Sequence, residues 1–281
     1  MLPDPEDFEI VTVQAGVCSI RSREFGETFH PVIGPMAEAR ALHVNGARLP
    51  QRLAVMKEAF VVWDVGLGAA ANALAVIEAA GGKLVELHSF DRTTAPLAFA
   101  LKHADQLGYL AAHRLVVECL LATSRATAGS VDWFFHPGDF AETLNSAKVP
   151  APHAILYDPY SPATNPDMWT LEHFTNLHAR LDPARSCLLT NYTRSTAMRV
   201  TLLLAGFFVG RGPATGEKAE TTVAANRLDL LREPLDRGWL QRVARSSNSA
   251  PFRKERLASE LASAIDLEGL ARHPQFSFTL R

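Results

Sequence analysis

The sequence predicts an α/β fold with a mainly parallel sheet and an antiparallel hairpin at one edge. Three observations indicate it. Apolar strand-like runs alternate with helical stretches from residue 59 onward. Some of these runs are apolar throughout, as in strands buried on both faces. A Gly/Pro-rich turn joins the last two runs. The 281 residues, 47% hydrophobic and 21% charged, are enough to bury a large core without cross-links.

The expected elements follow in chain order. Residues 1–54 are expected to form an N-terminal arm, with short strands at Val11–Gln14 and Cys18–Arg21 and a helical turn or two at Met36–Leu42. The expected strands of a central domain over residues 55–225 are Ala59–Asp64, Leu84–Phe90, Val131–Phe135, Ala154–Tyr157, Ser186–Thr190, Phe207–Arg211 and Glu220–Ala225. The expected helices are Ala70–Ala80, Pro96–Leu107, Phe140–Ala147, Asp167–Arg180 and Thr193–Ala205, three of them followed by glycine.

Residues 226–281 are expected to form a C-terminal helical extension. It contains an amphipathic stretch at Gly238–Ser246, a linker at Ser246–Pro251 and a last helix near Arg256–Ile265. The extension holds ten Lys/Arg against seven Asp/Glu, whereas the whole chain has a net charge of −2. This basic surplus can meet phosphates or belong to a solvated helical face. The candidate RNA contacts are Arg242, Arg245, Arg253, Lys254 and Arg256.

Composition excludes several classes of protein. The three cysteines are far apart in the sequence, which argues against a disulfide framework and favours a cytoplasmic location. No Cys/His cluster has zinc spacing, so no metal site is expected. The longest apolar runs, such as Thr201–Val209, are too short to span a membrane. No signal peptide is expected either.

A glycine loop follows the first strand of the central domain. Asp64-Val65-Gly66-Leu67-Gly68 leads into the next helix, where glycines permit a tight turn and the helix N-terminus offers free N–H groups. A dinucleotide loop would also permit Ala71 at its third glycine position. The Asp64 carboxylate, however, suits an ammonium group better than a pyrophosphate. The loop therefore favours S-adenosylmethionine over NAD, and a tight turn without a ligand is the alternative.

Two further carboxylates follow strand ends. Asp91 lies 23 residues past Gly68, where an acid can accept hydrogen bonds from both ribose hydroxyls. Asp139 and Phe140 follow the strand Val131–Phe135, where a carboxylate and a ring can bracket an adenine. The alternative for each aspartate is the N-cap of the next helix. All these features fall at the carboxyl ends of strands, where open α/β sheets bind ligands.

The most informative segment is the proline-stiffened loop that follows the strand Ala154–Tyr157. Its Asp158-Pro159-Tyr160 run resembles the Asn/Asp-Pro-Pro-Tyr/Phe loop of amino-methylating transferases. A nitrogen nucleophile must present its lone pair to a methyl carbon, and a carboxylate can hold its N–H or take its proton. Asp158 is therefore the expected catalytic residue, and Tyr160 is expected to pack on the ring of the acceptor. The alternative is a structural turn.

Over most of residues 20–225 the chain resembles the tRNA 5-methylaminomethyl-2-thiouridine methyltransferase family. The segments that carry the resemblance are Asp158–Trp169 (DPYSPATNPDMW), Asp64–Asn72 (DVGLGAAAN), Arg23–Arg52 and Thr190–Arg211. Bifunctional members of this family carry a fused flavin-dependent oxidase and usually have Asp-Gly-Phe-Ala-Pro in the loop. Here the loop reads Asp158-Pro159-Tyr160-Ser161-Pro162, closer to stand-alone members. No second dinucleotide loop follows residue 225, so no oxidase domain is expected.

The resemblance implies a class I, Rossmann-like methyltransferase fold with S-adenosyl-L-methionine as cofactor. It implies methylation of the aminomethyl group of 5-aminomethyl(-2-thio)uridine at the tRNA wobble position, with an enzyme on another chain forming that group. Asp158 matches the catalytic acid. The positions expected at the cofactor are Glu38, Asp64, Gly66, Gly68, Asn72, Asp91, Asp139 and Phe140. Those expected at the substrate are Phe29, His30, Pro159 and Tyr160.

Two other functions fit the same residues. The chain could methylate a small-molecule or protein amine, which agrees with its sequence pI of about 6.6. It could also bind the cofactor without turnover, as a partner in an RNA-modifying assembly with the C-terminal extension as the docking element.

Overall fold

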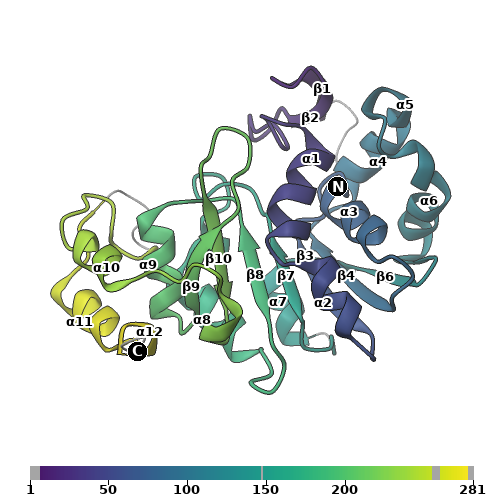
Figure 1. Cartoon of the computed structure of the whole chain (residues 1–281). Coiled ribbons are helices and arrows are strands. Elements are labelled where there is room, and N and C mark those ends of the chain that lie inside the picture. The colour runs from purple at the N-terminus through teal and green to yellow at the C-terminus, as the bar shows by residue number, and fades with distance from the viewer. Residues whose placement is uncertain (1–6, 147, 255–259, 278–281) are drawn as a thin grey trace.

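An eight-stranded sheet forms the centre of the molecule (Figure 1). The computed structural model describes residues 7–146, 148–254 and 260–277. The strands lie in the order β5-β6-β4-β3-β7-β8-β10-β9. Their bounds are β3 Phe60–Val65, β4 Val85–Asp91, β5 Arg125–Ala128, β6 Val131–Pro137, β7 Ala154–Tyr157, β8 Leu188–Asn191, β9 Phe208–Gly212 and β10 Thr221–Ala225.

The five strands β6, β4, β3, β7 and β8 are parallel to their neighbours in this group, and β10 runs antiparallel to both β8 and β9. The predicted parallel sheet with an antiparallel hairpin at its edge is thereby confirmed. At the other edge β5 also pairs antiparallel, with β6. Strand β5 was not predicted, because its four residues, Arg-Ala-Thr-Ala, include no apolar run and Ala126 is the buried one among them.

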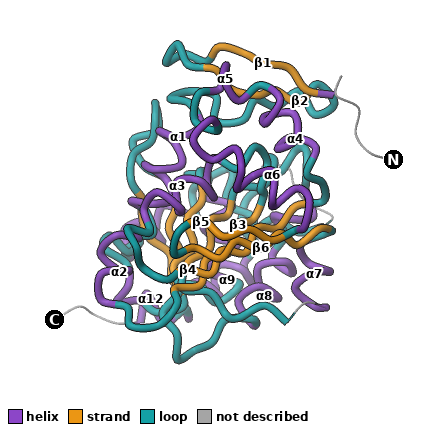
Figure 2. The backbone as a smooth tube through the Cα atoms, turned by 90° about the vertical axis from the view of Figure 1, so that its right-hand side faces the viewer, coloured by secondary structure: helices purple, strands orange, loops and turns teal. Residues whose placement is uncertain are grey.

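Side chains alternate between two cores, one on each face of the sheet. In β3, Phe60 and Val62 face the first core, while Val61, Trp63 and Val65 face the second. Because both faces are covered, all six residues of β3 are buried. Helices α3, α4 and α6 cover one face and α7, α8 and α9 the other (Figure 2).

The helices of the central part largely follow the predicted ranges. Their bounds are α3 Ala71–Ala79, α4 Ala95–Lys102, α5 Ala104–Leu107, α6 Arg114–Thr123, α7 Phe140–Ser146, α8 Leu171–Ala179 and α9 Thr196–Leu204. Helix α6 was not predicted, although it buries Val117 and Leu120 on one face. The predicted helix over Asp167–Arg180 is two segments, because Thr170 is extended and caps α8 through its side chain. Ala147, the last residue of the predicted Phe140–Ala147 helix, lies outside the described residues.

The N-terminal arm contains more regular structure than expected. Strands β1 Phe8–Thr12 and β2 Cys18–Ser22 pair antiparallel, so the expected strand at Val11–Gln14 was placed too late. After them come α1 Pro35–Ala39, a π-helical segment Arg40–Asn45 and α2 Leu49–Val55. This stretch buries Ala39, Leu49 and Leu53 in the first core. The arm packs against α3.

The C-terminal residues pack against the second core. Helix α10 Arg237–Val243 buries Trp239, α11 Ala264–Arg272 buries Leu270, and α12 Pro274–Ser277 buries Phe276. Of the predicted last helix near Arg256–Ile265, residues 260–263 are not helical, Ala264 and Ile265 begin α11, and 255–259 lie outside the described residues. Helix α11 begins later because Ser263 and Asp266 form a capping box. Within the described ranges, no helix has the length and apolar character needed to cross a membrane.

Candidate active site

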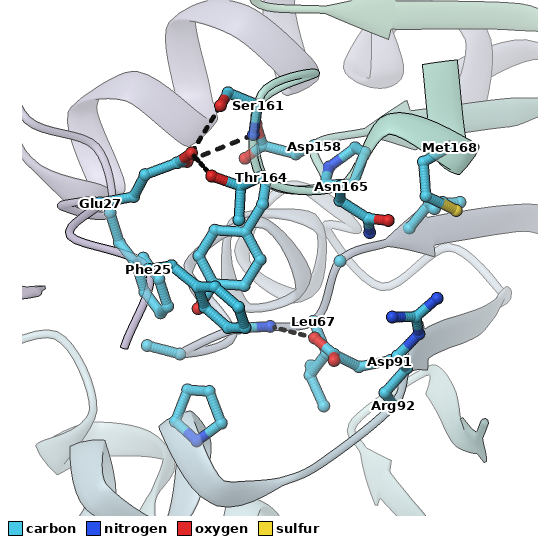
Figure 3. Close-up of a pocket in the computed structure, with 18 of the residues that line it drawn as sticks. Phe25, Glu27, Leu67, Asp91, Arg92, Asp158, Ser161, Thr164, Asn165 and Met168 are labelled. Atoms are coloured by element: carbon cyan, nitrogen blue, oxygen red, sulfur yellow. Dashed lines mark hydrogen bonds between the residues drawn. The ribbon is translucent and has the colours of Figure 1, made fainter. Parts of the chain in front are cut away.

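A cavity of about 440 Å³ opens at the carboxyl ends of the parallel strands (Figure 3). Loops after β3, β4, β6 and β7 line it from the sheet, and the arm lines it from the other side. Twelve of the thirteen residues predicted from the sequence line this cavity: Phe29, His30, Glu38, Gly66, Gly68, Asn72, Asp91, Asp139, Phe140, Asp158, Pro159 and Tyr160. The structure thus brings together residues that are more than a hundred positions apart in the sequence.

The glycine loop requires glycine at Gly66. Its φ is +93°, and a Cβ there would lie 2.7 Å from the carbonyl oxygen of Asp158. Any side chain would therefore push the loop after β3 away from the loop after β7. Gly68 also has a positive φ, of +48°, and its N–H donates to Asp91 Oδ2 at 3.0 Å. The glycine loop is in this way fixed to both neighbouring strand ends.

Asp158 lies at the centre of a buried polar group. Asn72 Nδ2 donates to Asp158 Oδ2 at 2.8 Å, and His43 Nε2 lies 3.7 Å from the same oxygen. The His43 ring is fully buried, and its Nδ1 is 2.7 Å from Thr190 Oγ1. Burial alone would raise the pKa of Asp158, but the His43 and His30 imidazoles and the Asn72 amide outweigh it and hold the pKa below its ordinary value. Asp158 is therefore a carboxylate at neutral pH.

Two polar atoms beside this carboxylate have no partner. Within the part of the chain that the structure describes, Asn72 Oδ1 and His43 Nε2 are buried without a hydrogen bond. Buried polar atoms of this kind are costly unless a ligand or water completes them. Asn72 is part of the cavity lining, so its free acceptor fits a ligand that brings N–H groups. Glu38 adds a second carboxyl to the lining, with a pKa raised chiefly by burial.

The loop after β7 is attached to the arm by one carboxylate. Glu27 accepts hydrogen bonds from the Ser161 N–H at 3.2 Å, from Ser161 Oγ and from Thr164 Oγ1 (Figure 3). Beside this attachment the Tyr160 ring packs against two rings of the arm, with centroid distances of 4.8 Å to Phe25 and 5.7 Å to Phe29. The cavity wall therefore includes an aromatic cluster made of Phe25, Phe29 and Tyr160.

For both Asp91 and Asp139 the alternative role was to cap the next helix, and the structure shows this role for Asp139 but not for Asp91. Asp139 does act as an N-terminal cap, because its Oδ1 accepts from the Ala141 N–H at 3.0 Å, yet it also lines the cavity. Its Oδ2 pairs with Arg92 at 2.6 Å; burial opposes ionisation, but this contact and the helix amides hold the pKa of Asp139 below its ordinary value. Asp91 does not cap α4, whose N-cap residue is Thr94. Its carboxylate instead joins the glycine loop to the end of β4.

Asp64 is the predicted site residue that does not line the cavity. Its side chain is fully buried under the glycine loop, where Oδ2 accepts a hydrogen bond from Ser89 Oγ at 2.7 Å. Ser89 Oγ in turn accepts from Trp133 Nε1 at 2.9 Å. Burial raises the pKa of Asp64 to about 8. The expected direct contact between Asp64 and a cofactor ammonium group does not fit this position.

Several lining or supporting residues were not found from the sequence. Lys218, from the β9–β10 hairpin, lines the cavity and donates to the Tyr192 carbonyl at 3.1 Å. Glu27 and His43 belong to the arm, where nothing in the local pattern distinguishes them from surface or core residues. Lys218 lies in a Gly/Pro-rich turn for which the sequence predicted only a connection between two strands. Their roles depend on contacts between distant segments, which a single sequence does not display.

Comparison with known proteins agrees with this geometry. Residues 117–227 match a family described as S-adenosyl-L-methionine-dependent methyltransferase. The chain is similar to the tRNA 5-methylaminomethyl-2-thiouridine biosynthesis bifunctional protein MnmC of Ralstonia nicotianae, with 33% identity over 73% of this chain and 32% of that protein. The same-named protein of Pseudomonas fluorescens (strain Pf0-1) is 29% identical over 89% of this chain and 38% of its own length.

A solved structure shares the fold. The crystal structure of MnmC2 from Aquifex aeolicus matches with a TM-score of 0.70 and 22% identity, over 94% of this chain and 84% of that one. The present chain spans about a third of the length of the bifunctional relatives that it matches. The family match and the 33% identity to the Ralstonia nicotianae protein show that the chain is an S-adenosyl-L-methionine-dependent methyltransferase and belongs to the family of the MnmC methyltransferase domain.

Proposed function

We propose that the protein transfers the methyl group of S-adenosyl-L-methionine to the aminomethyl group of 5-aminomethyl(-2-thio)uridine at the tRNA wobble position. The observation that carries this proposal is the Asp158 carboxylate, kept ionised between the glycine loop and an aromatic cluster. The names of the relatives support it, because they refer to tRNA 5-methylaminomethyl-2-thiouridine biosynthesis. In this proposal an enzyme on another chain supplies the aminomethyl group.

The cavity residues fit S-adenosyl-L-methionine, whose chemical contribution is an electrophilic methyl group on a sulfonium. Gly66 has no room for a side chain, so the glycine loop lies directly against the Asp158 loop in the cavity wall. The free Asn72 Oδ1 and the buried Glu38 carboxyl offer acceptors to the amino-acid end. Asp91 stands at the end of β4, in the position of a ribose partner. Asp139 and Phe140 line the same cavity beyond it and would hold the adenine.

Asp158 has two tasks in the proposed reaction. Its carboxylate first accepts an N–H of the neutral amine and so aims the nitrogen lone pair at the methyl carbon. As the new C–N bond forms, the methyl–sulfur bond would break and the sulfur would leave as a neutral thioether. The nitrogen would become cationic, and its extra proton, held by the Asp158 carboxylate, would pass to solvent. A carboxylate with a lowered pKa is a weak base, so most of its effect comes from orientation and from stabilising the developing positive charge.

The aromatic cluster of Phe25, Phe29 and Tyr160 is the proposed platform for the uridine ring. Stacking on aromatic side chains is a common way to hold an unstacked base. Phe25 is 43% exposed, so its ring is available to a base that enters from solvent. The wobble base lies in a single-stranded loop, where such a base can leave the stack at low cost.

A second candidate function is methylation of a small-molecule or protein amine. The observation that favours it is the overall charge of −2 and a sequence pI of about 6.6, because tRNA-binding proteins often carry a basic surplus. The same Asp158 chemistry would serve such an amine. The C-terminal residues 226–281, proposed as a separate extension beside the arm 1–54 and the methyltransferase domain 55–225, carry the basic surplus that the first function would use.

A methyl-transfer assay with labelled S-adenosylmethionine tests the proposal. The acceptors are bulk tRNA from a strain that makes aminomethyluridine but lacks the methyltransferase, and tRNA from its wild-type parent. We expect label in the deficient tRNA alone, and digestion should yield the methylaminomethyl nucleoside. Asp158→Ala should bind the cofactor in calorimetry and lose at least about a hundredfold in turnover.

Two results would count against it. Turnover of Asp158→Ala at the level of the unchanged protein would remove Asp158 from the mechanism. Label in neither tRNA, with cofactor binding established, would overturn the tRNA proposal. Transfer to a panel of free amines in the same protein sample would then favour the second function.

A further inference from the structure

A second cavity, of about 360 Å³, lies at the opposite ends of the parallel strands from the active site. Phe60 begins β3, His153 precedes β7 and Ser186 precedes β8, and all three line it. Helix α2 and the segment after β10 complete the wall with Arg48, Arg52 and Arg232. We name it the basal arginine cavity.

Its charge is positive and uncompensated. Three arginines line the cavity, and no acidic side chain does so among the described residues. In the same described part of the chain, none of the guanidinium groups of Arg48, Arg52 and Arg232 has a carboxylate within 4 Å. Like charges gathered without counter-charge destabilise a fold unless an anion balances them.

The arginines are held in place by neutral groups. Arg52 Nη2 donates to the Ser186 carbonyl at 2.9 Å, and its guanidinium lies over the Phe60 ring at 5.0 Å. Arg48 Nη2 donates to the Leu230 carbonyl at 2.7 Å. The Arg48 backbone has a φ of +54°, a left-handed conformation that residues with a side chain seldom adopt. These contacts orient the positive groups without neutralising them.

One donor at this place lacks a partner. Arg52 Nη1 is buried and makes no hydrogen bond with any residue that the structure describes. His153 adds another donor, because its Nδ1 accepts the Val61 N–H at 2.9 Å and the proton of the neutral ring therefore sits on Nε2. Burial, then the nearby Arg185 and Arg52 charges, lower the pKa of His153 to about 4, which keeps the ring neutral. A planar guanidinium fork beside further N–H donors matches the oxygens of a phosphate group.

We propose that the basal arginine cavity binds a phosphate group, with Arg52 Nη1 as its buried donor and Arg48 and Arg232 as its counter-charges. The phosphate can come from a free anion or from the backbone of a bound RNA. The inference does not depend on the reaction at Asp158, since the two cavities open at opposite ends of the strands.

Calorimetry of the full chain at low ionic strength, with inorganic phosphate and with pyrophosphate, tests the free-anion source. Filter binding with bulk tRNA at several salt concentrations tests the backbone source. The variants are Arg52→Gln and Arg232→Gln, the second of which changes an exposed side chain and leaves the core intact. Arg125→Gln is the matched control, because it removes one positive charge at the distant β5 edge. S-adenosylmethionine binding checks that each variant is folded.

We expect the two cavity variants to weaken the binding of at least one probe by roughly tenfold or more, and the control to leave it within twofold. If the phosphate belongs to RNA, the tRNA affinity of Arg232→Gln falls and its salt slope decreases by about one. If the phosphate is a free anion, pyrophosphate binding is lost and tRNA affinity is unchanged. Equal binding of every probe by the cavity variants and the control would overturn the proposal.

Discussion

At the residue scale, Asp158 depends on a neighbour that sequence motifs do not reveal. The fully buried His43 ring lies between Asp158 and Thr190, on a π-helical segment of the arm. Its imidazole thus lies beside Asp158, the carboxylate that the proposed reaction requires. Since this imidazole and that of His30 overcome the effect of burial on the pKa of Asp158, removing His43 should make the carboxylate easier to protonate.

The change His43→Phe keeps a ring of similar size and removes both nitrogens. We expect the acidic limb of the pH profile of kcat/KM to move to higher pH, because the ionised form of Asp158 is then lost earlier as pH falls. The pKa of Asp158 lies below its ordinary value, so its ionised form is present above that pKa and is lost as pH falls through it. Without His43 this loss begins at a higher pH. Methyl transfer measured from about pH 3 to 8 checks this.

The control for this prediction is His113→Phe, which alters a half-buried imidazole 3.7 Å from Glu78 and outside the cavity. Its pH profile should match that of the unchanged protein. An acidic limb of His43→Phe that coincides with the control would show that His43 does not set the ionisation of Asp158.

At the scale of elements, the sequence identifies those whose pattern is local. Strand β3 was predicted as Ala59–Asp64 and is Phe60–Val65, because burial on both faces produces a continuous apolar run. The loop residues at strand ends were found for a related reason: Gly66 and Asp158 stand directly after such runs. Elements without such a run were missed, β5 among them.

Contacts between elements were beyond the sequence in principle. Asp139 and Arg92 pair across 47 positions, and Glu27 and Thr164 meet across 137. Neither pair has a spacing that helix or strand periodicity would reveal. Asp64 is a residue whose local motif misled: its position in the glycine loop predicted a ligand contact. Its carboxyl instead accepts a hydrogen bond from Ser89 and points into the sheet. Local pattern thus identifies where a site is, and packing decides which of its residues face the ligand.

The loop after β7, here called the acceptor loop because Asp158 and Tyr160 lie in it, is attached to the arm through Glu27. This attachment gives a prediction at the scale of elements. Glu27→Ala removes the acceptor of three hydrogen bonds from Ser161 and Thr164. We expect kcat/KM for tRNA to fall by about tenfold to a hundredfold, since a loop displaced by about 1 Å loses orientation of the amine. S-adenosylmethionine affinity should stay within twofold, because Glu27 lies on the acceptor side of the cavity. Initial rates and calorimetry measure the two quantities.

Glu9→Ala provides the matched control, since it removes a half-exposed carboxylate of strand β1 that pairs with Arg23 at 3.3 Å. It should leave both quantities unchanged. Equal loss of cofactor affinity and turnover in Glu27→Ala would instead indicate general damage to the cavity and contradict a role confined to the acceptor loop.

At the scale of the whole molecule, the C-terminal residues close an edge that the central sheet leaves open. Strand β9 is the last strand of the sheet, and an unpaired outer edge invites pairing with other chains. Residues 233–235 cover part of this edge, with Leu235 N–H donating to the Val209 carbonyl at 2.9 Å. The Gln275 side chain then completes it: its Oε1 accepts the Val209 N–H at 2.7 Å.

The side chain of Gln275 makes three hydrogen bonds. Its Nε2 donates to the carbonyls of Val209 and Leu235, each at 2.8 Å, and the side chain is buried. The amide therefore behaves as a short substitute for a ninth strand. This contact joins residues 66 positions apart and holds α12 against the sheet.

Gln275→Leu is expected to lower the free energy of unfolding by about 2–3 kcal/mol, because it leaves the buried Val209 N–H without an acceptor and removes two further bonds. Urea denaturation should show a lower midpoint with an unchanged m-value. Ser277→Ala, an exposed position in the same helix, should keep the original midpoint. If both variants unfold at one midpoint, the edge of β9 is closed by residues 233–235 alone. A lower midpoint for Gln275→Leu together with concentration-dependent association would show that the C-terminal residues protect the sheet edge as well as stabilise it.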